Sequence, residues 1–473
     1  MLPLEIANGR LRVACAGEPN RDALEDLRDS YGVDLDLEPV PPEELQEAIR
    51  RTFAAAESVV ELVRDLDASV GGLAESVEDQ LADVRDLANQ PPVIRFVNLL
   101  IREAHEARAS DIHLDATRDG LRIRYRVDGV LSELPSPPRG LQAAIVSRIK
   151  LLAELDIAER RVPQDGRIRV RLDARELDLR IATVPTLHGE SVVLRLLDRG
   201  GRPVTLDELG MAPDTLESFR RLARKQHGIL LSTGPTGSGK TTTLYAALAL
   251  RNPTAEKIIT VEDPVEYQFG GITQVPVHAK AGVTFAGALR SILRQDPDVL
   301  MVGEMRDRET SAIAIQAAMT GHLVFSTLHT NDAVSAIPRL IDLGVEPYLV
   351  ASTVEGVLAQ RLVRKVCAEC RVRYRPEPAV VALLVADGTF PETLERGAGC
   401  PSCRNSGYRG RTGLFELLIP SEEFRQATAQ GAELAQLRRL AAAEGIQTLR
   451  ADGWCKVQAG ITTVEEVLRV VGE

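Results

Sequence analysis

The spacing of apolar residues changes its period near the middle of the chain, and the change separates two kinds of domain. Helical spacing is found at 93–107 and 141–155, and period-two alternation at 120–129, 167–172 and 176–184. The first alternating segment ends in Asp-Gly, which is typical of a hairpin turn. We therefore predict a compact α+β domain over 91–203.

Beyond this domain, short apolar runs alternate with helical segments. The runs lie at 228–233, 258–261, 299–302 and 323–327. Such alternation predicts an α/β core with a mainly parallel sheet, over 204–363. A stretch rich in Cys, Gly, Pro and Arg interrupts the pattern at 364–415, and 416–473 returns to helical spacing.

The N-terminal part has a weaker pattern. Strand-like runs at 11–15 and 33–37 flank a helical segment at 21–30, and Pro42 begins a helix that runs to about residue 53. We predict a separate module over 1–55. For 56–90 we predict an acidic helical connector or mobile linker; a solvated charged segment without a partner is the alternative.

Charge supports this division. The formal net charge is -11, and residues 1–90 hold 21 acidic and 8 basic residues, against 47 and 49 in the rest. A protein that wraps bulk nucleic acid is usually basic, so the composition disfavours that class. We expect the acidic N-terminal part to dock on a basic surface of a membrane partner, with an affinity that falls as salt rises.

The sequence has no feature of a secreted or membrane-spanning chain. Six cysteines in 473 residues are too few for a disulfide scaffold. The start lacks the regions of a signal peptide, and no uninterrupted apolar run reaches about 18 residues. We expect a cytoplasmic protein that reaches a membrane only through partners.

A glycine-rich loop follows the run at 228–233 and matches the G-x-x-x-x-G-K-[ST] phosphate-binding pattern. Its glycines allow successive N–H groups to face one anion, and the following helix adds its dipole. Lys240 is expected to reach the β- and γ-phosphates, and the Thr241 hydroxyl to bind Mg²⁺. The predicted nucleotide-binding residues are Gly234, Pro235, Thr236, Gly237, Ser238, Gly239, Lys240, Thr241 and Thr242.

Two other apolar runs end in carboxylates. Glu304 follows one of them, where an acid can hold Mg²⁺ or its water. Glu262, Asp263 and Glu266 follow the other, and one of these could act as general base toward the attacking water. Surface acids that cap the next turn are the alternative.

Two histidines, His322 and His329, flank the run at 323–328. Residues seven apart on a strand point to opposite faces unless the strand ends between them. A role in sensing the nucleotide phosphates and a structural role both remain open.

Four cysteines form two C-x-x-C pairs, Cys367 with Cys370 and Cys400 with Cys403. In a cytosolic chain this spacing predicts a tetrahedral zinc site. A redox pair and an iron–sulfur cluster are the alternatives. We expect the two remaining cysteines, Cys15 and Cys455, to be buried apolar positions or inert thiols.

Together these motifs resemble those of the secretion ATPases of the type II secretion and type IV pilus superfamily. The nucleotide motifs are GPTGSGKTTTLYA at 234–246, ITVEDPVEY at 259–267, RQDPDVLMVGEMRD at 294–307 and TGHLVFSTLHTNDA at 320–333. Further matches are SDIHLD at 110–115, RYRVDGV at 124–130, LDIAERRVPQDGR at 155–167, LAQRLVRKVC at 358–367 and GYRGRTGLFELL at 407–418. The resemblance is close over about 91–473, whereas 1–55 resembles only the later part of the family's N-terminal recruitment domain.

The resemblance implies a fold and residue roles. The implied fold is a RecA-like P-loop core preceded by a PAS-like α+β domain, with an inserted tetracysteine zinc subdomain and a helical C-terminus. Glu266 is implied to be the catalytic glutamate, with Glu262 and Asp263 as supporting acids. Glu304 is implied to be the Walker B acid, and His322 and His329 fall on the histidine box.

The resemblance also singles out arginines. Those at positions that reach nucleotide phosphates in the family are Arg180, Arg195, Arg290 and Arg294. An arginine at the γ-phosphate stabilises charge in the transition state. Arg290 and Arg294 lie four apart on a predicted helix and so share a face. A surface salt bridge is the alternative for each arginine.

The leading hypothesis is a hexameric motor at the cytoplasmic face of the inner membrane. It would hydrolyse ATP with Mg²⁺, contain Zn²⁺, and drive pseudopilus assembly and protein export in type II secretion. The implied partners are an inner-membrane platform protein and a recruiting membrane protein with a cytoplasmic domain, with no nucleic acid.

Three other functions remain open: a type IV pilus extension ATPase, a RecA-like nucleic-acid translocase, and a nucleotide-binding scaffold with weak turnover. VVLRLLDR at 192–199 and the residues around the cysteines favour secretion over pilus assembly.

Overall fold

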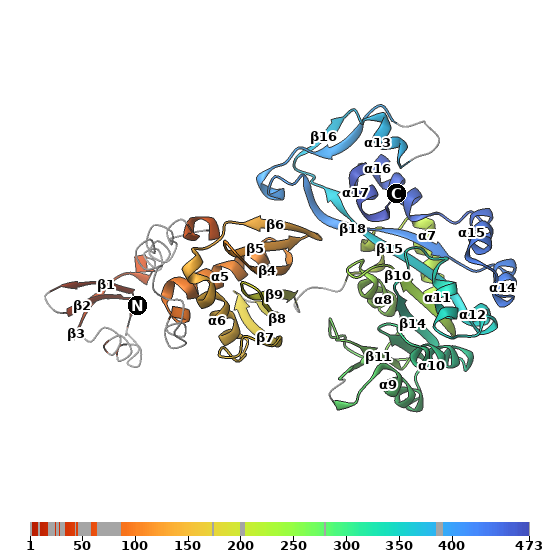
Figure 1. The fold of residues 1–473 in the computed structure, drawn as a ribbon, viewed down its shortest axis with the longest axis horizontal. Helices are drawn as coiled ribbons and strands as arrows, with labels where there is room; N and C mark the ends of the chain where they lie inside the picture. Colours follow the sequence, from red (N-terminus) through yellow and green to blue (C-terminus); the bar gives the residue numbers. More distant parts are fainter. Residues whose placement is uncertain are drawn as a thin grey trace. The chain divides into compact units, whose positions relative to one another are not determined.

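The structure, a computed structural model, contains two compact units. The first comprises 1–172 and 178–196, and the second 173–177 and 197–473 (Figure 1). The residues described are 2–7, 10–17, 24, 28, 34–42, 44–45, 58–63, 87–172, 175–198, 204–278, 281–384 and 391–472. Among the helices in these ranges, none has the length and apolar character that a membrane crossing demands. The division of the chain into six segments stays a prediction.

The first unit begins with a three-stranded sheet of order β1-β2-β3. Its strands are β1 (Leu2–Ala7), β2 (Arg10–Cys15) and β3 (Asp34–Pro39). β2 pairs antiparallel with β1 and parallel with β3, so both strands predicted here are confirmed. The helices predicted at 21–30 and from Pro42, and the connector at 56–90, lie largely outside the described residues.

A six-stranded sheet of order β6-β5-β4-β9-β8-β7 follows, with two helices. The strands are β4 (Ala109–Thr117), β5 (Gly120–Val127), β6 (Val130–Leu134), β7 (Gln164–Leu172), β8 (Arg175–Thr186) and β9 (Gly189–Asp198). The helices are α5 (Pro91–Glu106) and α6 (Gln142–Leu152). The predicted α+β architecture is therefore present, whereas the finer likeness to a PAS domain stays a prediction.

Local sequence explains the hairpin and the packing of this domain. Asp128 and Gly129 have φ of 49° and 85° between β5 and β6, which is the conformation that a two-residue hairpin turn requires. The alternating Ile123 and Tyr125 are fully buried, and the Tyr125 hydroxyl donates to the Leu100 carbonyl of α5 at 2.8 Å. One face of β5 thus packs under the helix.

The second unit is built on a seven-stranded sheet of order β12-β11-β13-β14-β10-β15-β18. The strands are β10 (Gly228–Thr233), β11 (Ile258–Glu262), β12 (Thr273–Pro276), β13 (Val299–Val302), β14 (Leu323–Leu328), β15 (Val354–Val366) and β18 (Tyr408–Leu418). All neighbours are parallel except β15 and β18. The four predicted strands and the mainly parallel sheet are confirmed.

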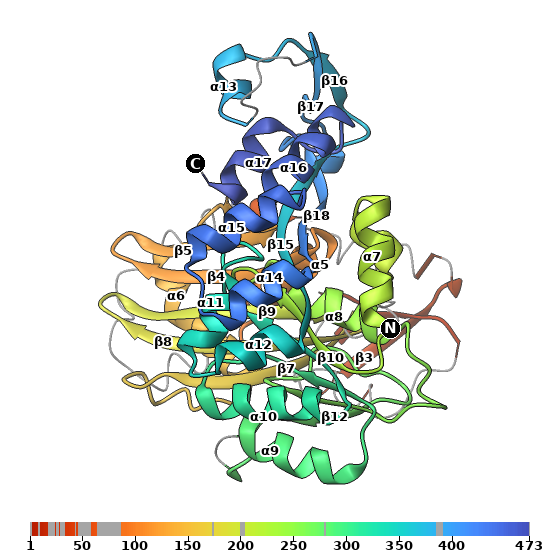
Figure 2. The same ribbon diagram turned by 90° about the vertical axis from the view of Figure 1, so that its right-hand side faces the viewer.

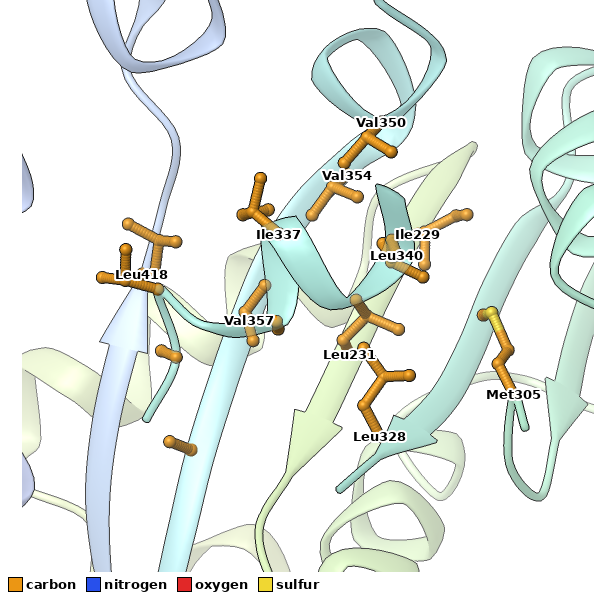
Figure 3. Packing of buried hydrophobic residues seen from close by; sticks show 14 of the residues in the cluster. Ile229, Leu231, Met305, Leu328, Ile337, Leu340, Val350, Val354, Val357 and Leu418 are labelled. Carbon is orange, nitrogen blue, oxygen red and sulfur yellow. The ribbon is translucent and has the colours of Figure 1, made fainter. Parts of the chain in front are cut away.

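Helices cover both faces of this sheet. On one face, α7 (Pro213–Ala223) and α8 (Lys240–Leu248) pack on Leu230 and Phe325. The other face packs against α9 (Phe285–Ile292), α10 (Arg308–Met319), α11 (Ala336–Asp342) and α12 (Pro347–Thr353). Figure 3 shows Ile229 and Leu231 of β10 on this face, with Leu340 of α11 beside them. Both faces are buried, as apolar runs without alternation predict.

The cysteine-rich stretch is an insertion between the antiparallel neighbours β15 and β18. It contains β16 (Arg371–Tyr374), α13 (Pro378–Ala382) and β17 (Leu394–Gly397), and it projects from the sheet (Figure 2). The C-terminal part is helical, as predicted. Its helices are α14 (Glu422–Ala429), α15 (Leu434–Ala443), α16 (Leu449–Gln458) and α17 (Val464–Val471).

Candidate functional site

The glycine-rich loop joins β10 to α8 and needs glycine at three positions. Gly234, Gly237 and Gly239 have φ of 148°, 79° and 87°, where other residues are strained. A Cβ at Gly234 would lie 2.5 Å from the Gln360 carbonyl oxygen, and one at Gly239 would lie 2.8 Å from the Gln360 side-chain nitrogen. A Cβ at Gly237 would meet no atom within 4 Å. The loop therefore packs tightly on β15 and leaves its middle open.

The other loop residues fall into two groups. Pro235 and Thr236 are exposed, whereas the Ser238 hydroxyl is buried and has no hydrogen-bond partner in the described part of the chain. Thr241 and Thr242 lie half-buried in the first turn of α8. An unpartnered hydroxyl and the N–H groups of a helix start suit an anion such as a phosphate.

Lys240 is the first residue of α8, and its side chain folds back over the loop. Its Nζ donates to the carbonyl oxygens of Gly234 at 2.7 Å and Pro235 at 3.0 Å. Burial lowers the pKa of Lys240 to about 8; the Glu304 carboxylate acts against this shift, and the Arg361 guanidinium adds to it. An acid and an arginine therefore lie close enough to Lys240 to affect its charge.

Glu304 and His329 reach this loop because β13, β14 and β10 are successive parallel strands of one sheet. Glu304 comes two residues after β13 and His329 directly after β14, at the carboxyl edge where the loop begins. The His329 Nε2 lies 3.4 Å from the Glu304 carboxylate, which also pairs with Arg306. Burial and the Lys240 charge lower the pKa of His329. The imidazole is therefore uncharged at neutral pH and can donate Nε2–H to Glu304.

The acids after β11 differ in their surroundings. Glu262 is 2% exposed, and its carboxylate accepts hydrogen bonds from Tyr245, from Thr260 at 2.5 Å and from Gln274 at 3.1 Å. Both of its oxygens are therefore engaged inside the core. Glu262, the predicted supporting acid, therefore has the contacts of a residue that stabilises the fold.

Asp263 and Glu266 lie nearer the surface. Asp263 is exposed and Glu266 half-buried. The Glu266 backbone N–H donates to the Tyr245 hydroxyl at 3.4 Å, which is long for a hydrogen bond. Because β11 is the neighbour of β13, these acids leave the sheet at the same edge as Glu304.

His322 does not join His329. β14 lies between them, and the Gly228 N–H donates to the His322 carbonyl at the amino end of β10. The His322 Nδ1 lies 2.9 Å from the Ala317 carbonyl oxygen. Seven residues of extended chain separate the two histidines by roughly 20 Å. Of these two histidines, His329 is the one that lies at the phosphate loop.

Arg290 and Arg294 both have partners near α9. Arg290 pairs with Glu309 at the start of α10. The prediction that Arg294 shares a helix with Arg290 is wrong, because α9 ends at Ile292 and Arg294 lies in the following 3₁₀ turn. The Arg294 guanidinium instead donates to the Arg290 carbonyl at 3.0 Å.

Arg180 and Arg195 belong to the first unit. Arg180 is half-buried on β8. Arg195 is on β9, and its side chain is 61% exposed and donates from Nε to Asp111 at 2.9 Å. Asp111 is almost fully buried, so it holds Arg195 at Nε while most of the arginine side chain is exposed.

Gln360 and Arg361, at the middle of β15, are site residues that the sequence analysis missed. The Gln360 side chain accepts from Thr243 of α8 at 2.7 Å, and Arg361 donates to Asn331. Both are almost fully buried beside the loop. Two adjacent polar residues inside an apolar strand were the available signal, because buried polar groups require partners.

The four predicted metal ligands converge. Cys367 lies 3.9 Å from Cys400 between sulfur atoms, Cys370 lies 3.8 Å from Cys403, and all four sulfurs are within 4.8 Å of one another. Four thiolates at about 2.3 Å from a tetrahedral zinc ion have sulfurs about 3.8 Å apart. A disulfide would need about 2.05 Å. The spacing therefore fits one ion and excludes paired cysteines.

Hydrogen bonds prepare one of these thiols for metal binding. Burial alone would raise the pKa of Cys403, but the N–H groups of Cys400 and Gly407 and the neighbouring thiols hold it at about 6. Burial raises the pKa of Cys370 to about 12. The hydrogen bonds therefore favour the thiolate at Cys403, and a thiolate is the form that binds a metal.

The phosphate loop after β10, the acid after β13 and the helix-covered parallel sheet define a P-loop ATPase. The model of the family described as "Type II/IV secretion system protein" matches residues 86–469. The chain belongs to this family.

Named relatives and a solved structure agree with this assignment. The chain is 47% identical to the type II secretion system protein E of Pseudomonas aeruginosa, over 98% of this chain and 92% of the relative. It is 40% identical to the type IV pilus assembly ATPase PilB of Myxococcus xanthus, over 99% of this chain and 83% of the relative. The crystal structure of the pilus retraction motor PilT with bound ADP is 27% identical, with a TM-score of 0.55 over 79% of this chain and 96% of that one.

Proposed function

We propose that this ATPase powers type II secretion, as a hexameric ring held at the cytoplasmic face of the inner membrane. The convergence of Lys240, Glu304 and His329 at one sheet edge carries the proposal of hydrolysis. Identity to the Pseudomonas protein supports secretion over the pilus-assembly alternative, because the match to PilB is lower.

The loop and its neighbours have distinct tasks in this proposal. Lys240 exchanges its two carbonyl partners for the β- and γ-phosphates of ATP, while the loop N–H groups hold the phosphate oxygens. Thr241, in the first turn of α8, and Glu304, across the strand edge, are the residues that would hold Mg²⁺ or its water. When bound, Mg²⁺ neutralises the charge that develops on the phosphates. His329 then keeps the Glu304 carboxylate oriented by donating Nε2–H.

Glu266 is the proposed general base. Unlike Glu262, it is partly accessible, so its carboxylate can accept a proton from water.

We also propose that Arg180 and Arg195 of the first unit move to the phosphates. Three further residues are proposed to act across a boundary between ring members: Arg290, Arg294 and His322. Sites completed in this way switch on only when the parts close, which couples hydrolysis to motion.

The cysteine cluster is proposed to hold zinc as a structural ion. It would fix the insertion on β15 and β18, and the insertion and the N-terminal module would offer surfaces to the platform and recruiting membrane proteins. The predicted PAS-like nature of the first unit belongs to the same proposal.

Two assays test the proposal. In the purified full chain, Glu304→Gln should reduce ATP hydrolysis by at least about a hundredfold while nucleotide still binds, because the metal-ordering charge is lost. The same variant should fail to restore export in a strain that lacks its own secretion ATPase. Unchanged hydrolysis by Glu304→Gln would refute the site assignment.

Restoration of pili but not of export would favour pilus assembly. Stimulation of hydrolysis by DNA, with a steep loss as salt rises, would favour a nucleic-acid translocase.

A further inference from the structure

A buried tyrosine connects the phosphate-loop helix to the segment that carries Glu266. Tyr245 lies in α8, five residues after Lys240, and is 3% exposed. Its hydroxyl donates to the Glu262 carboxylate and accepts the Glu266 backbone N–H at 3.4 Å. One oxygen atom therefore touches both ends of the turn after β11.

The hydrogen bonds at the Tyr245 hydroxyl have a defined direction. The hydroxyl donates its proton to the Glu262 carboxylate. The lone pairs of the hydroxyl then face the Glu266 N–H. Burial and the Glu262 carboxylate raise the pKa of Tyr245, so its proton stays in place over the working range. Thr260 and Gln274 hold Glu262 itself, at 2.5 and 3.1 Å.

Aromatic packing keeps the tyrosine ring from moving. Its centroid lies 4.8 Å from that of Phe269 at an interplanar angle of 63°, and 6.1 Å from that of Tyr267 at 75°. Edge-to-face pairs at these distances are attractive and directional. Tyr267 and Phe269 follow Glu266 in the chain, so the ring contacts the same segment that the hydroxyl holds.

We propose that Tyr245 is a positioning residue for ATP hydrolysis, whose hydroxyl holds the Glu266 backbone at a set position relative to Lys240. The inference rests on the proposed role of Glu266 as general base. Tyr245 and Lys240 share one rigid helix, so the tyrosine ties the base to the element that grips the phosphates. The tie acts on proton transfer from water and leaves the phosphate contacts intact.

The test is Tyr245→Phe in the purified full chain. The ring and its packing remain, but the Glu266 N–H loses its acceptor. We expect kcat to fall about tenfold, because misplaced catalytic groups lose rate steeply. KM for ATP and the Kd for a fluorescent ADP analogue should change less than twofold. Tyr348→Phe, on the exposed face of α12, is the matched control and should keep the wild-type rate.

Two further variants show whether Tyr245 acts through Glu266. In a Glu266→Gln background, Tyr245→Phe should lower the residual rate by less than twofold, because coupled residues are not additive. Glu262→Gln should mimic Tyr245→Phe, since an amide no longer fixes the direction of the hydroxyl, and it replaces that variant if the latter fails to fold.

An unchanged kcat in Tyr245→Phe would overturn the inference, and so would equal losses of kcat and nucleotide affinity. A full tenfold loss in the Glu266→Gln background would also overturn it. If Glu266→Gln itself hydrolyses at the wild-type rate, the proposed base is wrong, which is a separate outcome from a silent Tyr245→Phe.

Discussion

The Nε2 atom of His329 lies 3.4 Å from the carboxylate of Glu304, although 24 residues separate them in sequence. Each residue follows a strand of the same parallel sheet, and β13 and β14 are direct neighbours. The pairing is therefore a product of strand order. It places the titratable imidazole of His329 beside Glu304, the acid whose orientation the site depends on.

This pair predicts an acid limb in the rate of hydrolysis. The pKa of His329 is lowered from its ordinary value of 6.5, so the ring becomes charged only below that pH. Protonation then makes a salt bridge that competes with the metal for Glu304. We expect kcat to fall as pH drops through the lowered pKa, and His329→Asn to be slower but flatter over the same range. Initial rates between pH 5 and 8 would check this; an acid limb unchanged in His329→Asn would contradict it.

The same shift has a consequence for stability. The unfolded state binds a proton at His329 near pH 6.5, whereas the folded state binds it only at lower pH. Stability must therefore decrease as pH falls below about 6.5. Urea unfolding of His329→Asn at pH 7.5 and 5.5 should show a smaller loss than the wild type.

Lys240 predicts proton uptake when nucleotide binds. Its pKa is about 8 in the free chain, and phosphates placed beside it raise that value. Above pH 8 a fraction of the lysines is neutral and must take up a proton on binding. Calorimetric titration with ADP at pH 8.5, in two buffers of different ionisation enthalpy, would measure the uptake. Binding without uptake at pH 8.5 would mean that the lysine is already charged.

The cysteine cluster predicts one zinc ion per chain. Cys403→Ser removes a ligand and should abolish stoichiometric zinc, whereas Cys455→Ser alters an exposed cysteine outside the cluster and should keep it. Elemental analysis of the purified proteins would measure the content. Iron with sulfide in the wild type would instead indicate an iron–sulfur cluster.

A buried ion pair predicts a large loss of stability in the first unit. Lys150 is fully buried, and its Nζ donates to Glu190 at 2.8 Å and to the Glu159 carbonyl at 2.6 Å. Lys150→Met leaves Glu190 as an unpaired buried charge and should cost about 3–5 kcal/mol. Denaturant unfolding would measure the cost.

Adding Glu190→Met should restore much of the loss, because neither charge then remains. A double variant as unstable as the single one would show that the Glu159 carbonyl is the dominant partner.

Much of the second unit could be predicted from the sequence, because strands buried on both faces have uninterrupted apolar runs. The Gly234–Lys240 loop could also be predicted, because its spacing of glycines and lysine is specific to phosphate binding. Strands such as β4 and β9 were missed, since half-exposed strands that carry Asp111 and Arg195 interrupt their apolar positions with charges.

Roles that depend on strand order were harder to predict. Spacing could not show that His329 reaches Glu304 while His322 lies at the other end of β14. Nor could it reveal that Glu262 is buried against Tyr245, because that contact depends on how α8 packs beside β11 and not on residue spacing.

One strand, β15, contributes both to the nucleotide site and to the cysteine cluster. Gln360 lies beneath the phosphate loop, and Cys367 comes one residue after the end of the same strand. Seven residues of extended chain span roughly 20 Å, and β18 is hydrogen-bonded alongside them as far as Val366. A force applied to the insertion is thus transmitted along β15 to the residues that lie beneath the phosphate loop.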